Sequence, residues 1–242
     1  MKAAIISDIH SNLEAIQAVI KDIKKRRIKN IFCLGDIVGY GANPNECAEL
    51  CFKESDEIIA GNHDWATTDK TDTSNFNKVA AIAVKWTKEH IKSEYFKKLQ
   101  ELPLTKKVDN LLLVHSTPEN PEAWDYLFNL EEFEKQFNFF TEQICFIGHS
   151  HIPNAVFQDD NGYTDFLNEN PFPIIKKRRY IINVGSVGQP RDLDPRASYV
   201  IYDGNKNSIE FVRIEYNIPL AGQKIIEAGL PEILSERLLV GK

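Results

Sequence analysis

The sequence predicts an α/β fold in which a parallel sheet is formed first and a second, partly antiparallel sheet follows. Up to residue 60, short apolar runs alternate with amphipathic helical patterns, and after residue 150 strand patterns are joined by short turns. The strand–helix–strand–helix–strand order implies parallel strands with right-handed crossovers. The chain contains no internal repeat or Gly/Ser-rich linker. We therefore expect residues 1–242 to form a single domain.

The first 60 residues justify the parallel sheet. Asn12 is positioned to cap a helix that runs through Arg27, with apolar residues recurring at helical spacing. Asn43 and Pro44 open a second helix that ends near Glu54, with proline at its first position. The apolar runs between these helices are short and bounded by polar residues or glycine, as is typical of buried strands. These strands are expected at residues 2–7, 30–34 and 57–60.

The middle of the chain is more helical, and the last third supplies the second sheet. Helices are expected at 74–91, 93–100 and 130–139, and strands at 111–115 and 143–147. Turn residues at 159–162 and 203–205 have the composition of hairpin turns. Residues 218–242 are interpreted as two short helices, with Pro231 opening the second. The later strands are expected at 154–158, 180–184, 198–202 and 208–215.

Composition and charge exclude some classes of partner. The hydrophobic fraction of 43% is that of an ordinary globular protein with a buried core. A net charge of −6 argues against wrapping of a nucleic-acid backbone, although it does not argue against small phosphorylated substrates. The basic run at 176–179 is interpreted as a solvated hairpin flank. No run of about 18 apolar residues is present, so no membrane-spanning helix is expected.

The N-terminus and the cysteines indicate a cytoplasmic protein. The apolar run at residues 3–6 is too short to be the core of a signal peptide. Without a secretion signal, the cysteines are expected to be reduced thiols, and they do not show C-x-x-C spacing. The oligomeric state stays open, a homo-oligomer included. The cysteines are Cys33, Cys47, Cys51 and Cys145.

Residues of the types that bind metals gather just after the predicted strands. Five of the six histidines lie there, and in open α/β sheets ligands bind beyond the carboxyl ends of strands. A mixture of carboxylate, amide and imidazole groups suits two divalent ions such as Mn, Fe, Zn, Ni or Co. In D-x-H and H-x-H, an extended backbone would point both side chains the same way. The candidate ligands are Asp8, His10, Asp36, Asn62, His115, His149 and His151.

Each of these motifs alone has a simpler interpretation. A single buried histidine is more often a hydrogen-bonded core residue than a ligand, and one D-x-H is usually incidental. The prediction of a metal site depends on all the motifs occurring together, each at the end of a strand.

The combined pattern resembles the calcineurin-like metallophosphoesterase family. The motifs are D-I-H at 8–10, G-D at 35–36, G-N-H-D at 61–64, H-S at 115–116 and G-H-S-H at 148–151. The segments CLGDIVGYGANPNEC, NVGSVGQPRDLDPRASYVIYD and GLPEILSERLLVGK are similar to one bacterial and archaeal branch of that family. The resemblance covers essentially the whole chain. It implies a four-layer α/β/β/α fold, a β-sandwich of two mixed sheets flanked by helices.

The resemblance also implies roles for the ligands. Asp36 would bridge two metals that share a hydroxide, and this hydroxide would attack phosphorus in line with the leaving oxygen. His63 is interpreted as the proton donor to the leaving group or a stabiliser of transition-state charge, the alternative being a structural hydrogen bond at the turn. One metal would be held by Asp8, His10 and His151, and the other by Asn62, His115 and His149.

Two departures from the protein phosphatases of the family bear on the substrate. Those enzymes carry Asp and then Arg where this chain has Gly39 and Tyr40. The absence of that Arg favours phosphodiesters or phosphoanhydrides over phosphomonoesters. Arg191, with Gln189, could supply a phosphate-binding cation instead. The alternative is that Arg191 pairs on the surface with its acidic neighbours at 192 and 194.

The leading prediction is a phosphoesterase acting on small nucleotide-like substrates. Aromatic residues near the ligands could stack on a nucleobase, although most rings of the segment 118–140 are expected in a helix core. The alternatives are a phosphomonoesterase or protein phosphatase, a diadenosine tetraphosphate hydrolase, and a catalytically silent scaffold of the same fold. The candidate stacking residues are Tyr40, Trp65, Trp124 and Tyr126.

Overall fold

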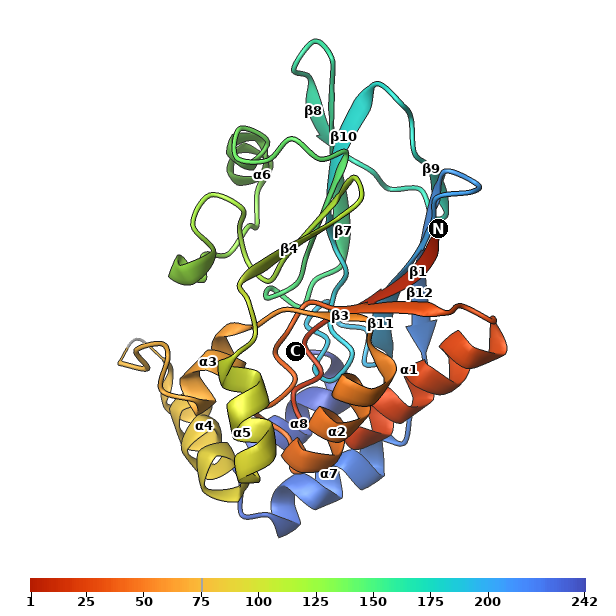
Figure 1. Cartoon of the computed structure of the whole chain (residues 1–242). Helices are drawn as coiled ribbons and strands as arrows, with labels where there is room; N and C mark the ends of the chain where they lie inside the picture. Colours follow the sequence, from red (N-terminus) through yellow and green to blue (C-terminus); the bar gives the residue numbers. More distant parts are fainter. Residues whose placement is uncertain (75) are drawn as a thin grey trace.

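Two six-stranded mixed sheets form the centre of the protein in the computed structural model, which describes residues 1–74 and 76–242 (Figure 1). The first sheet has the order β3-β2-β1-β11-β12-β9. Its first three strands are parallel, and β11 pairs with β1 in the antiparallel direction. The strands are β1 (Lys2–Ile6), β2 (Asn30–Cys33), β3 (Glu57–Ile58), β9 (Phe172–Pro173), β11 (Ala197–Asp203) and β12 (Ser208–Ile214).

The second sheet has the order β4-β5-β6-β10-β7-β8. Its three central strands β5, β6 and β10 are parallel, and antiparallel strands extend it at both edges. The strands are β4 (Thr105–Val108), β5 (Leu111–Val114), β6 (Ile144–Ile147), β7 (Asn154–Asp159), β8 (Thr164–Phe166) and β10 (Arg178–Asn183).

Helices cover the outer faces of both sheets. Most of them lie together on the side of the first sheet, whereas α6 lies apart, beside the second sheet (Figure 1). Asn12 caps α1 by accepting from the Ala15 N–H, and Pro44 begins α2, both as predicted. The helices are α1 (Leu13–Lys25), α2 (Pro44–Glu54), α3 (Asn62–Thr67), α4 (Lys78–His90), α5 (Ser93–Gln100), α6 (Leu130–Gln136), α7 (Ile218–Glu227) and α8 (Ile233–Val240), with a 3-10 turn η1 at Pro121–Ala123.

The hydrophobic core explains why the central strands are continuously apolar. Alternate residues of a strand face opposite sides of its sheet. Ile5 packs in the cluster shared by the two sheets, with Phe146 of β6, whereas Ile6 packs in the cluster shared with α1. A third cluster joins the second sheet to Phe133 of α6. The layers are therefore helix, sheet, sheet and helix, which confirms the predicted four-layer α/β/β/α class.

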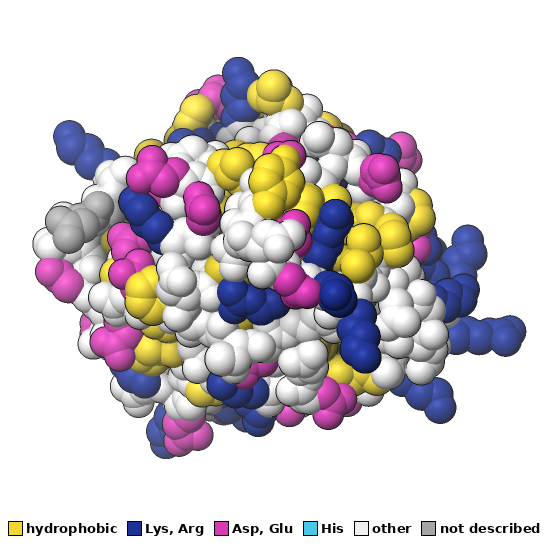
Figure 2. All heavy atoms as spheres, turned by 90° about the horizontal axis from the view of Figure 1, so that it is seen from above, with side chains coloured by type: hydrophobic (Ala, Val, Ile, Leu, Met, Phe, Trp, Pro, Cys, Tyr) yellow, Lys and Arg dark blue, Asp and Glu magenta, His cyan; other side chains and the backbone are white. Residues whose placement is uncertain are grey.

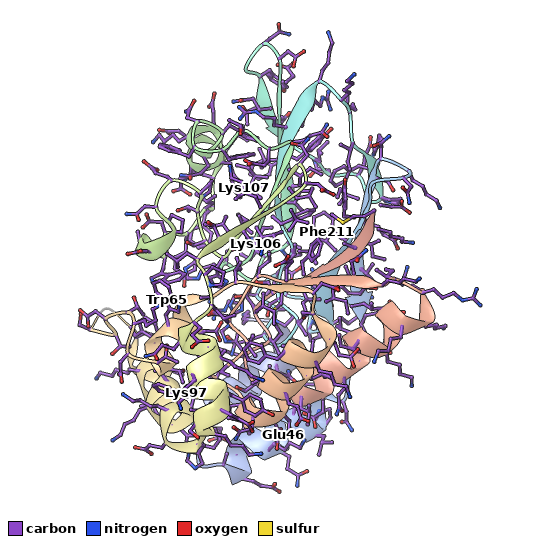
Figure 3. All side chains as sticks on the ribbon, in the orientation of Figure 1. Glu46, Trp65, Lys97, Lys106, Lys107 and Phe211 are labelled. Atoms are coloured by element: carbon purple, nitrogen blue, oxygen red, sulfur yellow. The ribbon has the colours of Figure 1, made fainter. Side chains whose placement is uncertain are left out.

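The elements differ from the prediction in several places: α3, β8 and β9 were not predicted, and α1 and α6 end earlier than expected, at Lys25 and Gln136. The helix expected at 74–91 begins at Lys78, because the Asn77 side chain accepts the Ala80 N–H and caps it there; residue 75 lies outside the described residues. The strand expected at 57–60 is only Glu57–Ile58. The strand β4 was not predicted, because it is a polar edge strand whose first three residues are exposed. In Figure 3, two of these residues, Lys106 and Lys107, are labelled on β4.

The basic run at 176–179 takes part in local packing. The Arg178 guanidinium lies 3.9 Å from the centre of the Phe157 ring. Arg179 donates hydrogen bonds to the carbonyls of Phe137 and Phe140, at 2.7 and 2.8 Å. Acidic and basic side chains are interspersed over the end of the molecule that Figure 2 shows. Among the described helices, none has the length and apolarity needed to cross a membrane.

Candidate metal centre

The predicted ligands converge where the two sheets meet. Asp8 and Asp36 follow β1 and β2 of the first sheet, while His115 and His149 follow β5 and β6 of the second. Asn62 is the first residue of α3. All seven predicted ligands are buried, none with more than 7% of its surface exposed. Segments separated by more than 100 residues therefore contribute to one polar cluster inside the protein.

The side chains form three overlapping groups, two of which contain Asp36. Asp8 Oδ1 lies 3.2 Å from His151 Nε2 and 3.8 Å from His10 Nε2. Asp36 Oδ2 lies 3.6 Å from His10 Nε2 and 3.4 Å from His115 Nε2. The potential ligand atoms within each group lie within 4.8 Å of one another. The groups are Asp8, His10 and His151; His10, Asp36 and His63; and Asp36, His115 and His149.

Backbone carbonyls orient the histidine rings. The Nδ1 atoms of His10, His115 and His151 lie 3.2, 2.8 and 2.5 Å from the carbonyls of residues 38, 34 and 189. A carbonyl can only accept, so Nδ1 carries a proton in each of these rings and Nε2 faces the cluster, where it can bind a cation once it holds no proton. For His149 the roles reverse, because its Nε2 lies 2.7 Å from the Trp124 carbonyl. Such second contacts are typical of metal-binding histidines.

Several atoms in the cluster have no hydrogen-bond partner. Asp8 Oδ1, Asn62 Oδ1 and His115 Nε2 are buried and unpartnered. Leaving a buried polar group without a partner is costly, and such groups are uncommon in folded proteins. Divalent cations would satisfy these oxygen and nitrogen atoms, and the mixed donor set suits Mn, Fe, Zn, Ni or Co. The residues present therefore fit a pair of metal ions.

The charges in the cluster are strongly coupled. Burial opposes ionisation of Asp8, but the nearby His151 and His115 lower its pKa below the usual value. Burial also opposes the charge on His115, yet Asp36 and then Asp8 raise its pKa to about 10. Burial and the neighbouring His115 lower the pKa of His149 to about 3. A bound cation would replace the proton on His115 as the positive charge facing the carboxylates.

The backbone at the ligands is tightly turned, which differs from the extended geometry expected for D-x-H and H-x-H. Asp8 and His10 have φ of 54° and 49°, and His149 and His151 have 65° and 61°. Positive φ is unfavourable for residues other than glycine, at a cost on the order of 1 kcal/mol each. Asp8 N–H donates to the Gly35 carbonyl and thereby holds one of these turns. The extended-loop prediction was wrong because the chain reverses around the cluster.

Two glycines allow the chain to approach the carboxylates. A Cβ atom on Gly61 would lie 2.1 Å from Asp36 Oδ1. One on Gly148 would lie 2.5 Å from Asp8 Oδ2. Any side chain at either position would displace a predicted ligand. Only glycine therefore fits at the first position of G-N-H-D and of G-H-S-H.

Asp64 organises the site, although the sequence analysis gave it no role. Its carboxylate accepts the N–H groups of Ile37, Val38 and Gly61, at 2.9, 3.2 and 3.0 Å. These bonds tie the loop after β2 to the start of α3. Burial, followed by the charge of Asp36, raises the pKa of Asp64 to about 7. The signal was the position of Asp64 at the third residue of α3, where an acidic side chain can bond back to the cap residue.

His63 lies between the ligand cluster and the surrounding aromatic residues. Its N–H donates to Asp36 Oδ1 at 2.8 Å, and its ring centre lies 4.4 Å from that of Tyr40. Burial lowers the pKa of His63 to about 4, against the opposing charge of Asp36. A Cβ on Gly39 would lie 2.5 Å from His63 Nδ1, which is buried and unpartnered. A ring nitrogen of His63 also lies within 4.8 Å of possible ligand atoms of His10 and Asp36.

Arg191 faces the site instead of its acidic neighbours. Its guanidinium lies 5.8 Å from the centre of the Tyr40 ring and donates to Gln189 Oε1 at 2.9 Å. Asp192 and Asp194 pair with Arg213 and Arg196. The alternative prediction of a surface ion pair for Arg191 was therefore wrong.

A cleft of about 400 Å³ opens beside the cluster. Tyr40, Trp124 and Tyr126 line it together with His63. Trp65 does not line the cleft; its ring packs edge-on against that of Trp124, and Figure 3 labels it near the junction of the helices and the sandwich. Three of the four candidate stacking residues are thus next to the ligands, and one is in the core.

The fold and this cluster define a class of two-sheet sandwich proteins with a metal-ligand site at the strand ends. The model of the calcineurin-like phosphoesterase superfamily domain matches residues 1–207. An uncharacterized protein of Methanocaldococcus jannaschii is 47% identical over 243 residues, which cover 99% of this chain and 98% of that protein. The chain therefore belongs to the calcineurin-like phosphoesterase superfamily, as the sequence motifs predicted.

Solved structures agree with this assignment. The crystal structure of a metallophosphoesterase from Sphaerobacter thermophilus is 38% identical, with a TM-score of 0.87, and covers 100% of this chain and 99% of that one. A hypothetical protein from Pyrococcus horikoshii is 19% identical, with a TM-score of 0.80, over 100% of this chain and 98% of that one. The second likeness shows the fold alone.

Metal binding is expected to raise the melting temperature by roughly 10 °C. A ligand at about a thousand times its Kd adds about 4 kcal/mol of stability, and each kcal/mol raises Tm by about 2–4 °C in a protein of this size. Thermal unfolding should be followed after EDTA treatment and after addition of Mn, Fe, Zn, Ni or Co. The variant His149→Ala should lose most of the metal-induced increase in Tm. The variant His90→Ala should keep this increase, because His90 is exposed at the end of α4. An unchanged Tm with all five metals would contradict a metal centre.

Proposed function

We propose that the protein is a metal-dependent phosphoesterase that hydrolyses phosphodiester or phosphoanhydride bonds in small, nucleotide-like substrates. The observation that supports it best is the set of buried, unpartnered ligand atoms beside an aromatic cleft. Two divalent ions bound there would supply positive charge that activates water and neutralises the phosphoryl oxygens. Asp36 would contact both ions. Asp8, His10 and His151 would hold one ion, and Asn62, His115 and His149 the other.

The chain's own residues would position the phosphate and move a proton. His63 would donate a proton to the leaving oxygen or stabilise its developing charge. Its neutral state in the substrate-free protein would shift toward the protonated form beside a bound phosphate, because a negative charge favours the imidazolium. Arg191 would bind a phosphoryl oxygen, held in place by Gln189 and by the face of the Tyr40 ring.

The diester preference rests on the residues next to His63. Gly39 leaves the His63 Nδ1 atom without a carboxylate partner, and Tyr40 stands where the protein phosphatases of the family carry an Arg. A phosphomonoester dianion needs more positive charge than a diester monoanion. With Arg191 as the proposed side-chain cation and no carboxylate to hold a proton on His63, the site therefore favours the diester or anhydride.

The direct test is hydrolysis after reconstitution with each metal. We expect bis(p-nitrophenyl) phosphate to be cleaved with a higher kcat/KM than p-nitrophenyl phosphate, and diadenosine tetraphosphate should be assayed alongside. Activity confined to monoesters would overturn the diester preference. Inactivity with every metal and substrate would leave the silent scaffold as the better interpretation.

Replacing Arg191 with Ala should lower kcat/KM by about 10–100-fold, mainly through a higher KM, since a hydrogen bond to a charged group contributes about 1.5–3 kcal/mol. Arg191→Lys should recover part of the loss. The matched control is Arg196→Ala, which removes a surface guanidinium bonded to Asp194. Equal kinetics for the Arg191 and Arg196 variants would exclude phosphate binding by Arg191.

A further inference from the structure

The cleft beside the ligand cluster is lined by aromatic side chains and has acidic side chains at its rim. Phe76, Trp124 and Tyr126 contribute the aromatic rings. Asp72 and Glu122 contribute exposed carboxylates. Among the described residues that line the cleft, none is Lys or Arg. This cleft therefore does not offer the cationic side chains that a phosphate would need.

The cleft walls are held in place by residues of the site. Tyr126 stacks on His149, with ring centres 4.1 Å apart and an angle of 23°. Phe76 packs on His63 at 5.3 Å. The two wall loops are joined by a hydrogen bond of 3.1 Å from the Trp124 indole N–H to Thr71 Oγ1. The walls are thus pre-positioned against the residues where the reaction would take place.

The inner end of the cleft also has unsatisfied polar atoms. Asn62 and His63 line it, and they are only 7% and 4% exposed. His63 Nδ1 is buried without a hydrogen-bond partner, and Asn62 Oδ1, which is also unpartnered, is the proposed metal ligand at this end. Because His63 is the proposed proton donor to the leaving oxygen, the group that leaves would lie on this side of the phosphate.

We propose that the cleft binds the leaving group of a phosphodiester, and that this group is a nucleoside without a further phosphate. This inference rests on the proposed function. A nucleobase would lie against the aromatic rings. The ribose hydroxyls and exocyclic amines would donate hydrogen bonds to Asp72 and Glu122. The volume of about 400 Å³ is within the range of small-molecule pockets.

The acidic rim would disfavour a second phosphate on the leaving group. Repulsion between like charges weakens binding of any leaving group that is itself an anion. Hydrolysis of a diadenosine polyphosphate releases a nucleotide, which carries such phosphates. The cleft therefore favours a simple nucleoside diester over diadenosine tetraphosphate.

A series of three nucleosides, whose 5′ group is cationic, neutral or anionic, tests the proposal. The probes are 5′-amino-5′-deoxyadenosine, adenosine and adenosine-5′-carboxylic acid, titrated calorimetrically into the EDTA-treated protein at low ionic strength, so that bound metal ions neither attract the anion nor repel the cation. We expect the cation to bind about tenfold more tightly than the anion, with adenosine between them. Tyr126→Ala should weaken all three by about tenfold, because it removes a stacking surface.

Two double variants distinguish the effect of the rim carboxylates on probe binding from the effect of the protein's net charge. The double variant Asp72→Lys/Glu122→Lys should invert the order, so that the anion binds most tightly. The double variant Glu131→Lys/Asp160→Lys changes the net charge equally at exposed positions outside the cleft and should keep the wild-type order. Equal affinities in the wild type, an unchanged order after reversal at the rim, or no binding at millimolar concentrations would overturn the proposal.

The binding measurement needs no turnover, so it can fail independently of the proposed function. Nucleoside binding in the expected order without hydrolysis of any phosphodiester would overturn the function and keep the cleft as a nucleoside site. If bis(p-nitrophenyl) phosphate is hydrolysed but the three nucleosides do not bind in the expected order of affinity, the proposed function stands and the assignment of the cleft as a nucleoside site is overturned.

Discussion

The variant Asp36→Asn is expected to lose at least about a hundredfold in phosphodiesterase activity together with bound metal. Asp36 Oδ2 lies 3.6 Å from His10 Nε2 and 3.4 Å from His115 Nε2, so it would contact both of the proposed ions. Asparagine keeps the oxygen that accepts the His63 N–H but replaces the other oxygen with an NH₂ group that cannot bind a cation. Mutation of a residue that only hydrogen-bonds to a metal ligand already lowers metal affinity or activity by about 10–100-fold. Mutation of a ligand shared by two ions should lower them further.

Activity and metal content should be measured together for this variant. Steady-state kinetics with bis(p-nitrophenyl) phosphate and elemental analysis of the desalted protein give the two values. Circular dichroism checks that the variant is folded, which is expected because the side chains have the same size. The matched control Asp160→Asn changes an exposed carboxylate of the β7–β8 turn, where it pairs with Lys177. Full metal content and activity within tenfold of the wild type would contradict the bridging role.

His63→Ala should lower kcat by about 10²–10⁴-fold while the metal content stays near that of the wild type. The physical reason is that His63 would supply the proton that the leaving oxygen needs. The loss should therefore be larger for a diester with an alkyl leaving group than for one with p-nitrophenolate, which leaves readily without a proton. The control is His90→Ala, since His90 lies in α4 and stacks on Trp86.

Three results would distinguish the roles that His63 could have. A loss that depends on the leaving group supports proton donation. An equal loss for alkyl and aryl esters supports stabilisation of transition-state charge instead. Loss of metal from the variant would make His63 a ligand, a role compatible with its position within 4.8 Å of His10 and Asp36 ligand atoms.

The convergence of the candidate ligands could be predicted in part because they follow strand ends. The carboxyl ends of neighbouring parallel strands lie at the same edge of a sheet, so Asp8 and Asp36 had to be near each other once β1 and β2 were parallel. The pairing that brings His115 and His149 beside them was not visible in periodicity or spacing, since it requires a second sheet to pack against the first. There the family resemblance, and not the pattern of apolar residues, supplied the expectation.

The surroundings of Tyr40 were not predictable in the same way. Tyr40 is only 6% exposed and packs in a cluster with Leu234 and Leu238 of α8 and Ala221 of α7. The C-terminal helices therefore bury one side of the residue proposed to support Arg191. They follow residue 207, where the family match ends. Contacts between residues almost 200 positions apart depend on where the chain returns in space, which local patterns do not contain.

The sequence by itself determined the α/β class, most of the elements and the candidate ligands, because strand and helix periods and the residue types at strand ends are local properties. Only the tertiary structure decided three further features. These are the positive φ angles at the ligands, the direction of Arg191 toward Tyr40 and the acidic, aromatic cleft. The reason is physical: each of them arises from packing between segments far apart in the chain, where sterics and charge act across space and leave no local pattern.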